Sequence, residues 1–137
     1  MRICIAGSMH HTERMLEVKK ELEQLGHEAI VSKFADAFIG KNDEEKEKIK
    51  MEQKMNDDAM REFWELLKKA DALLVLNLER KGIPGYIGGN AFLEMGWAYI
   101  LQKPIFLFNP IPDIALYKSE IEAMRPTFLH EDLANIG

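Results

Sequence analysis

Short apolar runs alternate along this chain with longer stretches in which apolar residues recur at helical spacing. The short runs are typical of buried β-strands, and the longer stretches are typical of amphipathic helices. Strands are predicted at residues 3–6, 27–31, 72–78, 104–108 and 127–129, and helices at 12–25, 56–69, from the glycine pair 88–89 onward, and 114–124. Strands that are apolar throughout and alternate with helices predict one α/β domain, in which helices cover both faces of a parallel sheet.

Single residues refine this pattern. Thr12 is expected to cap the helix that begins there, and Gly26 is expected to end it. Residues 41–55 are dense in charge, which predicts a solvated helix or a lid. Trp64 and Trp97 stand at helical spacing among apolar residues, so we expect both in the core.

Composition narrows the class of protein. The 137 residues carry a formal net charge of −5, and no basic stripe is present to bind a nucleic-acid backbone. Cys4 is the only cysteine, which argues against a disulfide framework and a thiolate metal site. No apolar run has the length of a signal peptide or a membrane span, so we expect a cytoplasmic protein with no membrane partner.

The strongest functional signal is the segment from Gly88 to Ala98. An apolar strand leads into a loop rich in glycine and proline, and the helix that follows is apolar except for Glu94. A carboxylate buried in such a helix lowers the stability of the fold by roughly several kcal/mol unless it is paired, hydrogen-bonded or open to a cleft. Its position after a strand and a glycine loop predicts the carboxyl edge of the sheet, where open α/β folds bind ligands. The alternative is a structural acid that caps a loop or pairs with a lysine.

A second candidate is the loop that joins the first strand to the next helix, Gly7-Ser8-Met9-His10-His11-Thr12. Backbone amides at such a helix start favour anions or polar ligand groups. The loop matches neither the dinucleotide-binding pattern nor the Walker A pattern, so no cofactor is implied. The alternative to a binding loop is a tight turn that only caps the helix. His10 and His11 are expected either to bind a ligand or to be solvated. No third residue at metal-like spacing supports zinc.

The Glu94 segment, followed by Lys103-Pro104 and a buried strand, resembles the E-x-G-x-A…G-K-P signature of the nucleoside 2-deoxyribosyltransferases. The related 2′-deoxynucleoside 5′-phosphate N-hydrolases share this signature, and Gly7-Ser8 resembles the opening of that branch. The resemblance implies a flavodoxin-like three-layer fold with a five-stranded parallel sheet. It also implies that Glu94 attacks C1′ of the sugar, expels the base and forms a glycosyl-enzyme. Water in the hydrolases, or a second base in the transferases, completes the turnover.

The chain departs from this family at the general acid. The position that carries this acid in the family corresponds to Phe63, which cannot donate a proton, so Glu62 or Asp58 is expected to replace it. A further acid of the transferases corresponds to Gly88, with Asn90 as the nearest polar residue. We therefore expect a hydrolase rather than a transferase. A catalytically silent nucleoside- or nucleotide-binding module is the alternative from another class.

The resemblance also implies a homodimer, because these enzymes lend a segment near the last helix to the neighbouring active site. Glu122 falls where the hydrolases contact a 5′-phosphate, and its charge favours a nucleoside with a free 5′-hydroxyl. The residues expected to bind this small-molecule substrate are Gly7, Ser8, Met9, His10, Gly88, Gly89, Asn90, Glu122 and Met124. The residues expected in an apolar dimer patch are Trp97, Tyr99, Ile100, Leu116 and Ile121.

Overall fold

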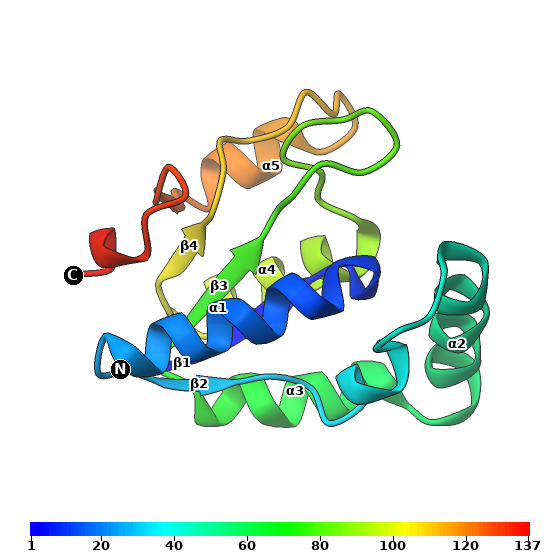
Figure 1. Cartoon of the computed structure of the whole chain (residues 1–137). Helices are drawn as coiled ribbons and strands as arrows, with labels where there is room; N and C mark the ends of the chain where they lie inside the picture. Colours follow the sequence, from blue (N-terminus) through cyan, green and yellow to red (C-terminus); the bar gives the residue numbers. More distant parts are fainter.

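A computed structural model describes residues 1–137, and its centre is a five-stranded sheet (Figure 1). The strands are β1 (Arg2–Gly7), β2 (Glu28–Ile30), β3 (Ala72–Leu76), β4 (Ile105–Leu107) and β5 (Thr127–Phe128). They lie in the order β2-β1-β3-β4-β5, and every neighbouring pair is parallel. This strand order, with helices on both faces, is the flavodoxin-like three-layer fold. The predicted fold class is confirmed.

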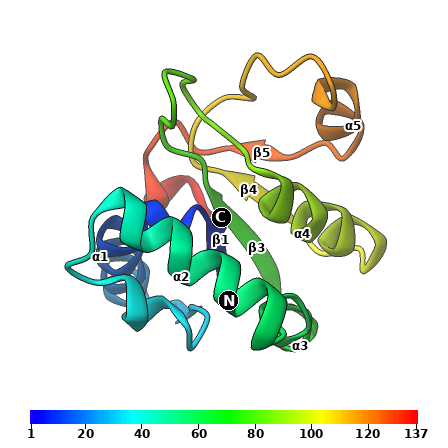
Figure 2. The same ribbon diagram turned by 90° about the vertical axis from the view of Figure 1, so that its right-hand side faces the viewer.

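Five helices accompany the sheet. They are α1 (Thr12–Gln24), α2 (Asp43–Asn56), α3 (Ala59–Lys69), α4 (Gly89–Ile100) and α5 (Lys118–Ala123), with short 3-10 turns η1 (Met9–His11), η2 (Ala35–Phe38) and η3 (Leu133–Asn135). Helices α1 and α4 lie on opposite sides of the sheet, and α2 stands beyond its edge (Figures 1 and 2). None of the helices combines the length and apolar character needed to span a membrane.

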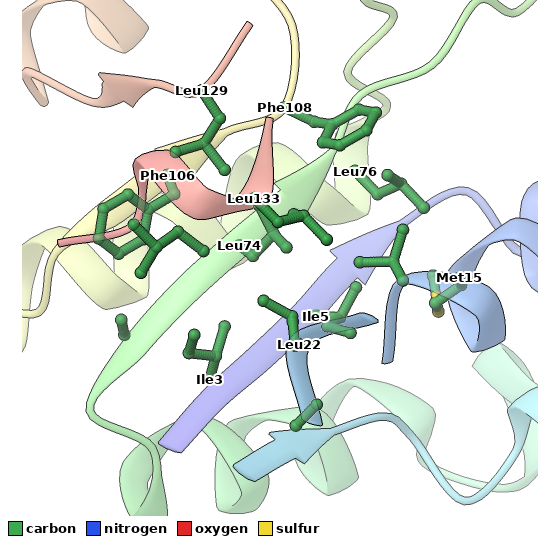
Figure 3. Packing of buried hydrophobic residues seen from close by; sticks show 14 residues of the cluster. Ile3, Ile5, Met15, Leu22, Leu74, Leu76, Phe106, Phe108, Leu129 and Leu133 are labelled. Carbon is green, nitrogen blue, oxygen red and sulfur yellow. The ribbon is translucent and has the colours of Figure 1, made fainter. Parts of the chain in front are cut away.

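Two apolar clusters hold these layers together, one on each face of the sheet. On the first face, Met15 and Leu22 of α1 and Leu133 of η3 pack against alternate residues of the central strands (Figure 3). On the second face, α3, α4 and α5 pack against the other alternate residues. The central strands β1, β3 and β4 are buried on both sides. Successive side chains of a strand point to opposite faces, so each of these strands contributes to both clusters.

Several predicted boundaries change for local reasons. Thr12 is the first residue of α1 rather than its cap, because η1 precedes it and its hydroxyl donates to the Met9 carbonyl at 2.6 Å. Helix α3 begins at Ala59, since Asp58 adopts a left-handed conformation with φ of 53°. The charged segment forms α2, which begins at a capping box of Asn42 and Glu45.

The chain leaves β1 and β3 toward opposite faces of the sheet. After β1 it enters α1, and after β3 it enters α4, so a crevice forms where these neighbouring strands end. Gly7 closes β1 at this point, where a Cβ atom would stand 3.0 Å from the Leu76 carbonyl oxygen. The close approach of the two strands therefore requires a glycine.

Candidate active site at the carboxyl edge of the sheet

A cavity of about 220 Å³ occupies the crevice between the ends of β1 and β3. Five segments line it: the end of β1 with η1, the chain after β2, helix α2, the start of α3, and the loop from β3 into α4. Among the expected residues, those that line it are Gly7, Ser8, Met9, His10, Gly88, Gly89, Asn90 and Glu94. The residues selected after β1 and before α4 therefore lie together at one cavity, and their role in substrate binding stays a prediction.

Glu94 lies in the second turn of α4, at the wall of the cavity. Burial raises the pKa of Glu94 to about 8, and the negative charge of Glu62 adds to the rise. No cation or hydrogen bond contributes to this pKa, so Glu94 is not a lysine-paired or loop-capping acid. The amides at the start of α4 do not offset burial, because Glu94 lies beyond the first helical turn, where the dipole effect fades.

Glu62 of α3 is the second carboxylate of this region. Its Oε1 accepts a hydrogen bond of 2.5 Å from the Ser32 hydroxyl, and Ser32 lines the cavity. Its Oε2 is buried without a hydrogen-bond partner. Glu62 and Glu94 also raise the pKa of the buried Cys4 thiol, in addition to the larger effect of burial, so both carboxylates lie near the same part of β1.

The structure does not bring Asp58 to the cavity. Asp58 is exposed, and its carboxylate pairs with Arg61 at 3.0 Å. It borders a separate hollow on the outer surface, together with Trp64 and Trp97. These two rings form an edge-to-face pair with centroids 5.8 Å apart and are half-buried, so they are not the core residues that the sequence predicted.

His10 lines the cavity but has no free ring nitrogen. Nδ1 lies 3.1 Å from an Asp43 carboxylate oxygen, and Nε2 lies 3.0 Å from a Glu47 carboxylate oxygen. Its side chain is 4% exposed, so the solvated alternative is wrong, whereas a role of His10 in ligand binding stays a prediction. His11 is also engaged, since its Nε2 donates to the Glu79 carbonyl oxygen at 2.9 Å. Ser8 accepts the His10 amide and caps η1.

Four cationic side chains that the sequence analysis did not select also line the cavity: Lys50, Lys54, Arg80 and Lys81. Lys50 pairs with Glu47 at 3.1 Å, and Arg80 lies 3.6 Å from Asp43. Lys54 and Lys81 have no ion-pair partner. For Lys50 and Lys54 the sequence did carry a signal, because they are one helical turn apart in the charged segment and so share one side of a helix. No such pattern indicated Arg80 and Lys81.

Glu122 and Met124 lie in α5 and just after it, and neither lines this cavity. Their expected role in a neighbouring subunit's site stays a prediction. Glu94 and the four cationic side chains therefore line the same cavity, whereas Glu62 does not line it and reaches it only through its hydrogen bond with Ser32. Comparison of the chain with models of protein families and with curated proteins finds no match.

Proposed function

We propose that this protein is an N-glycosidase-type enzyme that cleaves the base–sugar bond of a (deoxy)nucleoside or a related compound. The observation that carries this proposal is Glu94, a carboxyl without a protein partner at the wall of the β1/β3 cavity, beside a second carboxyl. We place the activity in the cytoplasm, since the only cysteine is buried and free.

In the first step, the Glu94 carboxylate attacks C1′ and the C–N bond breaks. The electron pair of that bond goes to the departing base, which takes a proton from the Glu62 carboxyl. In the second step, water attacks C1′ of the glycosyl-enzyme, gives its proton to Glu62 and releases Glu94. The reaction therefore requires two carboxyls that hold one proton between them. The pKa of Glu94, raised to about 8 by burial and by the negative charge of Glu62, keeps one proton in this region at neutral pH.

The cations of the cavity favour a substrate with an anionic group. Lys54 and Lys81 have no carboxylate partner, so a negative ligand would supply the charge that the protein does not. This differs from the expectation drawn from Glu122, which lies outside the cavity of its own chain. Hydrolysis remains preferred to transfer, because Gly88 occupies the position of the additional transferase acid.

A binding module is the second candidate, and one observation favours it. A pKa of about 8 leaves Glu94 mostly protonated at neutral pH. A neutral carboxyl donates a hydrogen bond to a ligand but does not attack a sugar. If the nucleophile is indeed Glu94, activity rises with pH until the carboxyl is ionised.

Release of free base from a panel of nucleosides and their phosphates tests the proposal. We expect Glu94→Gln to lower turnover by at least ~10²-fold with the fold intact. Glu62→Gln should fail mainly on poor leaving groups and still cleave a substrate with an activated aryl leaving group. Asp58→Asn is the matched control, since Asp58 is an acid of the same segment outside the cavity.

Two outcomes would contradict this scheme. Unchanged activity in Glu94→Gln removes the covalent step, and equal losses on both leaving groups remove the acid role of Glu62. Binding of a nucleoside without release of base from any compound identifies the binding module instead.

A further inference from the structure

Helix α2 is held in place by polar contacts rather than by the core. Its two buried residues are Lys46 and Gln53, and none of its side chains belongs to either apolar cluster. Its main contacts are with η1, η2 and α3, and it stands beyond the ends of the strands (Figures 1 and 2). It nevertheless forms one side of the cavity through Glu47, Lys50 and Lys54. Ligand contacts on that side therefore depend on what fixes α2.

His10 makes the central contact between α2 and the end of β1. Its two ring nitrogens lie 3.1 Å from Asp43 and 3.0 Å from Glu47, which are one turn apart on α2. A neutral imidazole has one N–H, so it would turn an unprotonated nitrogen toward one of these carboxylates. Only the imidazolium donates to both. The geometry thus requires the charged form of a side chain that is 4% exposed.

The other charges around His10 complete this contact. Lys46 Nζ donates to the His10 carbonyl at 3.0 Å and pairs with Glu13 of α1 at 2.9 Å. Arg80 approaches Asp43 from the β3–α4 loop, and Lys50 pairs with Glu47 on α2 itself. From η2, the titratable group is Asp36, which is exposed and is not a partner of His10. The neighbouring His11 is bonded to the Glu79 carbonyl.

The two carboxylates keep their charge over a wide pH range. His10, followed by Lys50, holds the pKa of Glu47 at about 2, and His10 also lowers the pKa of Asp43. Mild acid therefore leaves this contact intact. Loss of the His10 proton leaves the ring with a single N–H, so one of the two hydrogen bonds to α2 is then lost.

We propose that the His10 imidazolium is a latch that holds α2 against the cavity and thereby positions Lys50 and Lys54 for the ligand. Loss of its proton loosens α2 and weakens ligand binding on that side. His10 is a positioning residue, since it acts through α2. The ligand-binding consequence rests on the proposed function of the cavity, whereas the latch itself is a property of the free protein.

Hydrogen–deuterium exchange of the free protein tests the latch, with rates corrected for the intrinsic effect of pH. Between about pH 6 and pH 8.5 we expect exchange of α2 amides to accelerate about tenfold, while amides of α1 stay unchanged. His10→Gln should show the fast exchange at both pH values. His130→Gln is the matched control, because His130 is exposed and has no contact with α2.

Asp43→Asn separates a latch from a merely structural contact. An asparagine amide can donate to an unprotonated His10 Nδ1 while Nε2–H donates to Glu47, so α2 should stay protected at both pH values. The ¹⁵N shifts of His10 should report two protonated nitrogens in the wild type at about pH 6. Exchange of α2 that does not depend on pH in the wild type, or a neutral His10 at that pH, would overturn the proposal. Neither measurement involves turnover, so failure here is distinct from failure of the N-glycosidase proposal.

Discussion

At the scale of single residues, Glu94 combines a place at the wall of the cavity with a cost in stability. Its pKa is about 8 in the folded protein, against an ordinary value of 4.5, because burial and Glu62 oppose its charge. The folded state therefore binds a proton more tightly than the unfolded state between these two values. As pH rises through this window, the unfolded chain loses its proton first, and the stability of the fold declines.

Because the charge of Glu94 lowers the stability of the fold as pH rises, we expect Glu94→Gln to stabilise the protein at high pH while it removes activity. One pKa unit corresponds to ~1.4 kcal/mol, so we expect a gain on the order of 1–3 kcal/mol at pH 8 and little gain near pH 4.5. Urea unfolding at both pH values measures the difference. Glu52→Gln, an exposed glutamate without an ion pair, is the control. A gain of equal size at both pH values would contradict the assignment to this carboxyl.

At the scale of elements, the end of α4 fixes the relation between α4 and α3. The Gln102 amide donates to the Tyr99 carbonyl at 3.0 Å, and the Lys103 amide donates to the Ala98 carbonyl at 2.9 Å, which is a Schellman motif. Lys103 Nζ then donates to the Leu67, Lys68 and Ala70 carbonyls at the end of α3. This turn therefore ties together the two helices that carry Glu94 and Glu62.

Gln102 is the weak point of this motif, because its φ of 58° is the left-handed conformation that favours glycine. We expect Gln102→Gly to stabilise the protein by about 0.5–1 kcal/mol, as the midpoint of urea unfolding would show. Gln102→Ala removes the same side chain but keeps the Cβ atom, so it should give no gain. Equal effects of the two substitutions would show that the backbone conformation is not the cause.

At the scale of the whole molecule, several large apolar side chains of the α4 and α5 region remain exposed in the single chain. Tyr99, Ile100 and Leu116 are 50%, 78% and 87% exposed. The paired rings of Trp64 in α3 and Trp97 in α4 are half-buried. Ile121, which the sequence placed in this patch, is the buried residue of α5 and packs in the core, so that assignment was wrong. The remaining residues support a proposed two-fold dimer through this face.

If the proposed dimer forms, light scattering at micromolar concentration should report twice the mass of the chain. We expect Ile100→Lys to produce a monomer, because it places a charge in the proposed patch. Leu25→Lys alters an exposed leucine at the end of α1 and serves as the control.

If Glu122 completes the partner's site, Glu122→Ser should improve binding of 5′-phosphorylated ligands relative to nucleosides. A monomeric wild-type protein, or no change in that preference, would contradict the shared site.

The sequence by itself determined the layers and the first catalytic candidate. Apolar runs of strand length and apolar residues at helical spacing are local patterns that the sequence displays directly. Because the predicted strands are apolar on both faces, a parallel sheet covered by helices on each side is the arrangement that buries them. Glu94 was visible for the same reason, as the one charge in an apolar helix. The loop 7–10 followed from its place after the first strand, since the ends of parallel strands meet at one edge.

Only the tertiary structure decided which distant residues meet. Asp58 and Glu62 are one turn apart, and the left-handed Asp58 that precedes α3 leaves Glu62 near Glu94 and Asp58 at the surface. His10 finds its partners in Asp43 and Glu47 because α2 folds back over η1. Such contacts depend on the packing of whole elements and on the desolvation it imposes. A pattern of local spacing carries no information on either. The approach of Glu62 to Glu94, the meeting of four cations at one cavity and the carboxylate partners of His10 therefore became known only from the fold.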